Sequence, residues 1–197
     1  MSNAYAVATV TAGLRALLTP AAAIVPGSLV TNLRPDALTV GQQSRGINIY
    51  LYMVRPNPHH MTEQLATRRH DGRLLQPVVE VLDLHYLLSF YGNDALLEPQ
   101  LLLGAASVAL RQQPILTPSV VKDAKDANLD VLGASDLAEQ RPCVQITHQS
   151  LSLEEMSKLW TTLIQTRYLL STNCICQGVF VEGKPPPSVP THGVARP

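Results

Sequence analysis

The sequence predicts a single α/β domain of the α+β type, in which a mixed, mostly antiparallel sheet is flanked by helices. Two patterns indicate this class. Strand-like runs rich in β-branched and aromatic residues alternate with segments whose apolar residues follow helical spacing. The length of 197 residues with 46% hydrophobic content suits one hydrophobic core. We expect the domain to occupy residues 1–183 and a proline-rich flexible tail to occupy residues 184–197.

The chain begins with a predicted amphipathic helix over residues 5–19. Val7, Val10, Leu14 and Leu17 recur at helical spacing, and Pro20 is expected to end the helix. Two short strand-like pieces follow, at residues 28–33 and 37–42. Because a turn-prone Arg-Pro-Asp separates them, they are predicted to form a hairpin or a meander.

Residues 47–54 are apolar on both faces, which is typical of a central strand covered on each side. Residues 55–77 contain prolines and an Asp-Gly turn, so they predict a long surface loop. Residues 78–91 again alternate as a strand. A helix is expected from residue 98 to about residue 112, because Pro99 suits its first turn and Pro114 follows its end.

The second half of the chain predicts further mixed structure. Residues 119–140 are polar and acidic, which fits either a short helix or a mobile segment. Residues 141–148 alternate like a strand, and residues 152–163 form a helix that Ser152 and Glu155 begin with a capping box. Residues 168–182 are strand-like for longer than usual, so this strand is either bulged or partly paired outside its own sheet.

Composition excludes several classes of protein. The chain has fifteen basic and fifteen acidic residues. Nucleic-acid binding depends on an excess of basic residues, so we expect no nucleic-acid partner. No basic leader or long apolar run predicts a signal peptide or a membrane span, so we expect assembly in the cytoplasm and no direct insertion into a membrane. Charged residues make up only 15% of the chain, which favours a surface covered by other subunits.

The charges are unevenly spread along the chain. Residues 1–60 hold four arginines and one aspartate, whereas residues 81–160 hold five basic and ten acidic residues. If these regions face opposite sides, copies of the chain could associate head to tail, and contacts of this kind make rings where they close.

Asp83, His85 and Ser89 share one strand face and suggest a hydrolytic triad. Geometry opposes this, because residues i and i+2 lie about 6.5 to 7 Å apart along a strand, and no G-x-S-x-G motif is present. Cys174 and Cys176 could bind zinc only with two further ligands at suitable spacing, so buried thiols explain them better. We therefore predict no catalytic, cofactor or metal site, and no enzymatic activity.

Four segments in combination resemble one protein family: NIYLYMVRPNP, LDLHYLLSFYG, EPQLLLGAASVALRQQPIL and QITHQSLSLEEMSKLWTTL. They are similar to the cap, or tail-terminator, proteins of phage-tail-like contractile injection systems of the antifeeding-prophage and virulence-cassette type. The resemblance spans about residues 5–183. Compared with some relatives the chain is short, without a further C-terminal domain, so a longer paralogue is a second candidate for part of the capping task.

The resemblance implies a structural cap protein with a tail-terminator-like fold. Such a protein forms a ring, expected to be a hexamer, at the end of the inner tube and contractile sheath. There it ends polymerisation and stabilises the extended sheath, within a particle that is released on lysis or anchored to a membrane through other subunits. Its partners are therefore other copies of itself and the sheath and tube proteins.

Two groups of residues are candidates for the interfaces of such a cap. Val179, Phe180 and Val181 are predicted to form an intersubunit arm, or alternatively to finish the local sheet. The basic cluster of Arg68, Arg69 and Arg73 could contact an acidic neighbour. Other functions stay open: a small adaptor or scaffold oligomer outside any particle, or a hydrolase using His85 and Ser89.

Overall fold

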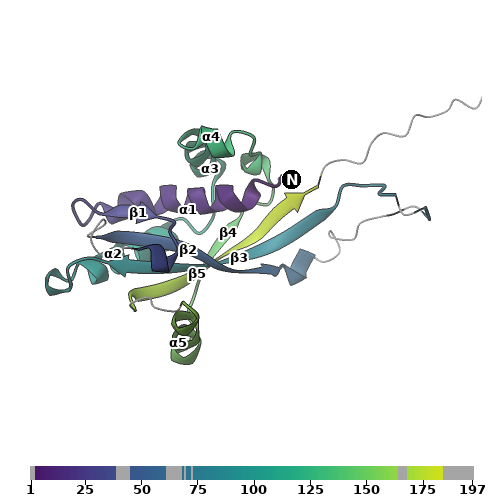
Figure 1. Ribbon diagram of the computed structural model, residues 1–197. Coiled ribbons are helices and arrows are strands. Elements are labelled where there is room, and N and C mark those ends of the chain that lie inside the picture. The colour runs from purple at the N-terminus through teal and green to yellow at the C-terminus, as the bar shows by residue number, and fades with distance from the viewer. Residues whose placement is uncertain are drawn as a thin grey trace, which may run out of the picture.

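The computed structural model contains one mixed five-stranded sheet with the strand order β1-β2-β3-β5-β4 (Figure 1). It describes residues 3–38, 45–60, 68, 70–71, 73–163 and 168–183. The strands are β1 (Leu29–Thr31), β2 (Gly46–Pro56), β3 (Val79–Tyr91), β4 (Gln145–Gln149) and β5 (Leu170–Glu182). β1 runs parallel to β2 and the other neighbours are antiparallel, so the predicted α+β class is confirmed.

Helices flank this sheet on both sides. They are α1 (Ala6–Ala22), α2 (Glu98–Gln112), α3 (Pro118–Asp126), α4 (Leu129–Leu132) and α5 (Leu153–Thr162). Short 3-10 turns lie at η1 (Pro35–Ala37), η2 (Pro58–His60), η3 (Asp94–Leu96) and η4 (Leu137–Glu139). α1 and α2 cover one face of the sheet, whereas α5 stands out on the opposite side (Figure 1).

The main hydrophobic core lies between the sheet and the pair α1 and α2. Leu14 of α1, Leu102 of α2 and Leu84 of β3 are fully buried there. Tyr86 also points into this core, where its hydroxyl is 2.8 Å from the Thr11 hydroxyl. Alternate residues of β3 therefore serve the core, as the period of two in the sequence predicts.

The prediction that Pro20 ends the first helix is wrong, because α1 continues to Ala22 with Pro20 inside it. Proline removes one backbone donor and disfavours the helical conformation mainly at the residue before it. Near the last turn this loss is small, and the following chain keeps its turn bonds: Ala23 N donates to Pro20 O and Val25 N donates to Ala22 O.

The expected hairpin at residues 28–42 is also wrong within the residues that the structure describes. Leu29–Thr31 pairs in parallel with the start of β2, and Pro35–Ala37 forms a 3-10 turn. Residues 39–42 lie outside the described part of the chain. The side chain of Asn48 holds the chain just after β1, because its amide donates to Leu33 O and accepts from Leu33 N, both at 2.9 Å.

Residues 119–140, where the sequence left a choice, are largely helical as α3, α4 and η4. Thr117 caps α3 by accepting from Val120 N, and Pro118 occupies its first turn. The capping box of α5 is confirmed, because Ser152 Oγ accepts from Glu155 N and Glu155 Oε2 accepts from Ser152 N. The predicted helix at residues 98–112 is confirmed as α2.

Candidate assembly surface

The long strands β3 and β5 extend beyond the rest of the sheet as a two-stranded ribbon (Figure 1). They pair from Phe90↔Leu170 to Val79↔Glu182, with one register shift opposite Asp83. β2 ends opposite Leu82, and β4 begins opposite Gln177. The long final strand is therefore bulged, and its last residues pair with β3 rather than with a strand elsewhere.

The side chain of Gln140 closes part of the outer edge of this ribbon. Gln140 Nε2 donates to Gly178 O at 2.8 Å, and Gln140 Oε1 accepts from Phe180 N at 3.0 Å. The amide thus forms the hydrogen bonds that a neighbouring strand would form, at the edge of β5 next to the start of β4. Because Gln140 is only 1% exposed, this contact is part of the folded domain.

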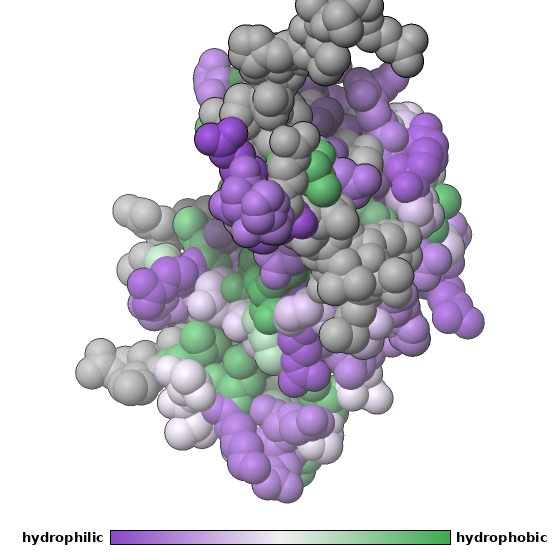
Figure 2. Space-filling model, turned by 90° about the vertical axis from the view of Figure 1, so that its right-hand side faces the viewer, coloured by the Kyte–Doolittle hydropathy of each residue, from purple (hydrophilic) through white to green (hydrophobic). Residues whose placement is uncertain are grey.

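The predicted arm residues lie in this ribbon. Val179 and Phe180 are buried, Val181 is half-buried, and all three pair with β3. Their side chains are thus largely occupied within the domain. Figure 2, which faces the side toward which the ribbon projects, shows separate hydrophobic patches among hydrophilic side chains.

The predicted basic cluster is only partly described. Arg68 makes an isolated antiparallel bridge to Leu74, and Arg69 lies outside the described residues. Arg73 is exposed, its backbone N donates to Asp71 Oδ1 at 3.0 Å, and its guanidinium lies 3.8 Å from Asp71 Oδ2. Arg73 therefore already has a partial counter-charge within its own turn.

Asp83, His85 and Ser89 do not form a triad. Asp83 Oδ1 instead accepts from Asn57 Nδ2 at 2.8 Å and from Gly178 N at 3.2 Å, which holds the bulge. Ser89 Oγ accepts from Ser171 Oγ at 3.1 Å. All three side chains are buried. The geometry therefore gives no support to a hydrolase that uses His85 and Ser89.

His85 belongs to a buried polar group on the face of the sheet opposite α1. Its ring packs edge-on against Tyr52, with ring centroids 6.1 Å apart. Burial lowers the pKa of His85, and Arg55 lowers it further, against the opposing effect of Asp83. Burial also raises the pKa of Tyr52, whereas the nearby Asn173 side chain lowers this pKa by a smaller amount.

Cys174 and Cys176 both lie in the core on β5 and are fully buried. Burial raises the pKa of Cys174 to about 12 and raises that of Cys176 as well, so both remain thiols. Among the residues described, no three His, Cys, Asp or Glu side chains gather to hold a metal ion.

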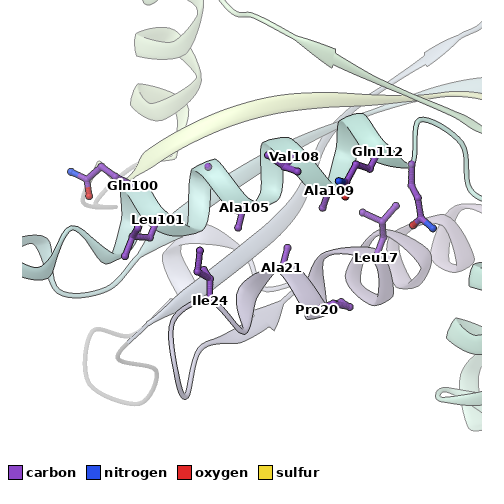
Figure 3. A pocket seen from close by; sticks show the side chains of 12 residues that line it. Leu17, Pro20, Ala21, Ile24, Gln100, Leu101, Ala105, Val108, Ala109 and Gln112 are labelled. Atoms are coloured by element: carbon purple, nitrogen blue, oxygen red, sulfur yellow. The ribbon is translucent and has the colours of Figure 1, made fainter.

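An apolar groove of about 880 Å³ lies between α1 and α2 (Figure 3). Its lining is uncharged, with apolar and small side chains along the floor and glutamines beside them. Representative lining residues are Leu17, Ile24, Leu101, Gly104, Val108 and Gln112. Sequence reasoning missed this groove, because its lining combines residues of two separate helices.

The sequence matches the family model described as the Pvc16 N-terminal domain over residues 9–192. This match covers nearly the whole chain. The chain belongs to the Pvc16 N-terminal domain family. The resemblance to cap and tail-terminator proteins is therefore confirmed at the level of the family.

One solved structure shares the fold of the chain. The chain is similar to a sheath/tube terminator of an extracellular contractile injection system, PVC, in the extended state, with a TM-score of 0.52 and 18% identity. That alignment covers 97% of this chain and 62% of the terminator, so the chain spans less than two thirds of its relative's length. A comparison with curated proteins gave no match.

The cap of the anti-feeding prophage, a tube-terminating cap, is a more distant match. It aligns with a TM-score of 0.40 and 16% identity, over 88% of this chain and 55% of the cap. As for membranes, no described helix of the chain is long and apolar enough to cross one.

Proposed function

We propose that this chain terminates the inner tube and contractile sheath of a phage-tail-like injection particle. The observation that carries the proposal is the Pvc16 N-terminal domain match over residues 9–192. The fold it shares with a PVC sheath/tube terminator supports the same role. The role is structural rather than enzymatic, and the chain acts as one part of a particle that assembles in the cytoplasm.

The finer proposal is a homo-oligomeric ring, a hexamer, that contacts both sheath and tube and stabilises the extended sheath. The projecting β3–β5 ribbon supports a contact with the last sheath ring by β-augmentation, in which main-chain hydrogen bonds join two chains. In this arrangement Val179, Phe180 and Val181 hold the ribbon in register, and the backbone edge beyond Phe180 receives the neighbour. Arg68, Arg69 and Arg73 are proposed to face an acidic neighbour.

Particle length tests the termination role. Particles assembled without this chain are expected to have a broad length distribution and ragged ends in electron micrographs, whereas particles with it have uniform length and a closed end. The protein should also co-purify with sheath and tube proteins. Uniform, capped particles in its absence would exclude the role, and a small oligomer that never joins particles would favour an adaptor.

A truncation tests the ribbon separately. A chain that stops after Glu182 keeps every residue of β5, so its fold should be intact by circular dichroism. If the segment beyond Glu182 takes part in the arm, the truncated chain forms rings that fail to cap sheaths. Normal particle length and capping would instead show that the segment beyond Glu182 takes no part in the contact, and would leave the termination role unaffected.

A further inference from the structure

Helix α5, which stands out from the sheet in Figure 1, is attached to the domain by few side chains. Trp160 is the only buried residue of its ten. Met156 and Leu159 are half-buried, and Leu153 is 88% exposed. The ring of Trp160 packs against that of Tyr168, with centroids 5.4 Å apart. The attachment of α5 therefore depends mainly on one aromatic side chain.

The hydrogen bonds of α5 are local to the helix. Ser152 and Glu155 cap its start, and Lys158 pairs with Glu154 four residues earlier at 2.6 Å. Within the described residues, no side chain of α5 forms a hydrogen bond with the sheet. Residues 150–151, which lie in no helix or strand, connect β4 to α5. The helix can therefore leave the sheet without breaking any of these bonds.

The sheet face on the side of α5 carries a buried polar group. His85 is 5% exposed there, and its Nδ1 atom has no hydrogen-bond partner among the described residues. Trp160 Nε1 is also buried, and the described part of the chain offers it no partner either. Burial raises the pKa of Tyr52, and the charge of Glu155 raises it further, so α5 lies close to this polar group. Buried polar atoms without hydrogen bonds oppose the docking of the helix.

We propose that α5 is a movable cover, which detaches from the sheet while the rest of the domain stays folded, and that the unpaired polar atoms at the contact favour its detachment. Water can form hydrogen bonds with Trp160 Nε1 and His85 Nδ1 once the helix has moved away. Openings of this kind involve the least firmly packed parts of a fold. The inference concerns the chain by itself and does not rest on the proposed termination role.

Urea unfolding of a Trp160→Ala variant of the full chain gives the first test. If α5 is only loosely docked, the substitution cannot cost more than the docking itself, because the rest of the fold remains. The equilibrium constant of unfolding should therefore rise by less than about tenfold. Leu102→Ala, at a fully buried position of the main core, is the control and should raise it by at least about thirtyfold. A larger than tenfold rise for Trp160→Ala would overturn the proposal.

Hydrogen exchange followed by mass spectrometry gives the second test. The amides of α5 should exchange at least about a hundredfold faster than those of α1 in the native chain. His85→Leu replaces the unpaired imidazole with an apolar side chain, so it should hold α5 more firmly and slow this exchange by at least about tenfold. His148→Leu is the control and should change nothing, because His148 pairs with Cys174 of the main core and so lies on the opposite face.

Two outcomes of the exchange measurement would overturn the proposal. In the first, α5 exchanges as slowly as α1, which would mean that the helix is a fixed part of the fold. In the second, His85→Leu leaves the exchange of α5 unaltered, which would mean that the polar group does not oppose docking. Circular dichroism of each variant checks that the domain is folded. Both measurements use the chain alone, so either outcome leaves the termination role unaffected.

Discussion

Gln140 and Phe180 are joined by a hydrogen bond of 3.0 Å from the Phe180 backbone N to the Gln140 side-chain oxygen. This bond and the bond from Gln140 Nε2 to Gly178 O together satisfy the edge of β5 next to the start of β4. An open strand edge is a template for pairing with other chains. Gln140 therefore continues the hydrogen bonding of this edge from the residues paired with β4 as far as Phe180.

Replacing Gln140 by alanine should destabilise the domain by about 1–3 kcal/mol, because Phe180 N and Gly178 O lose a buried partner. The free energy of unfolding, measured in urea, checks this value. Gln145→Ala, at an exposed position on β4, is the control and should change stability by less than about 0.5 kcal/mol. Equal losses in both variants would mean that the Gln140 amide has no special role at the edge.

The sequence predicts structure well where its signals are local. The helix α2 follows from Pro99 and Pro114, and the start of α5 follows from the pair Ser152 and Glu155, three residues apart. Alternation indicated most of β3, and a long strand-like run of residues indicated β5. These elements were predictable because propensity, capping and burial pattern all act within one or two turns of chain.

What the sequence did not predict depends on partners far along the chain. Gln140 contacts Phe180 across 40 residues, and no local pattern marks it as an edge residue. The path of the chain after β1 likewise involves a distant partner, because the amide of Asn48 binds the backbone of Leu33. The groove exists only because α1 and α2 pack side by side, so its lining combines residues from separate segments.

The buried ring of His85 predicts a pH dependence of stability. Burial lowers its pKa in the folded protein, whereas the unfolded chain has a histidine pKa of about 6.5. The folded state therefore binds fewer protons, and its stabilisation is complete above about pH 6.5 and falls as the pH drops below that value. This residue contributes a slope of at most about 1.4 kcal/mol per pH unit.

Unfolding in urea between pH 7.5 and pH 5 measures that slope. His85→Gln removes the titrating group, so its stability should decline less steeply below pH 6.5 than that of the wild type. The exposed His148 offers His148→Gln as the control for removing a histidine. Parallel curves for His85→Gln and the wild type would show that His85 does not couple protonation to folding.

The three thiols should differ in reactivity because two of them are buried and one is partly exposed. Cys174 and Cys176 are fully buried, and burial raises the pKa of Cys174 to about 12, so neither presents a thiolate at neutral pH. Cys143 is partly exposed. We expect one of the three thiols to react with a chromogenic disulfide reagent in the native protein, and the other two only after denaturant is added. Fast reaction of all three would contradict the buried positions.

Raising the salt concentration tests whether charges hold the copies of the proposed ring together. The uneven charge of the sequence favours an electrostatic contact, but three of the early arginines already have partners in the same chain. Arg34 pairs with Asp36, Arg45 pairs with Glu98, and Arg15 donates to Asn128 Oδ1.

We therefore expect the ring to persist when salt is raised from about 0.1 M to 0.5 M, because screening weakens exposed ion pairs and leaves apolar contacts intact. Light scattering across this range measures the effect. A ring that dissociates as the salt concentration rises would instead show that exposed charges hold the copies together.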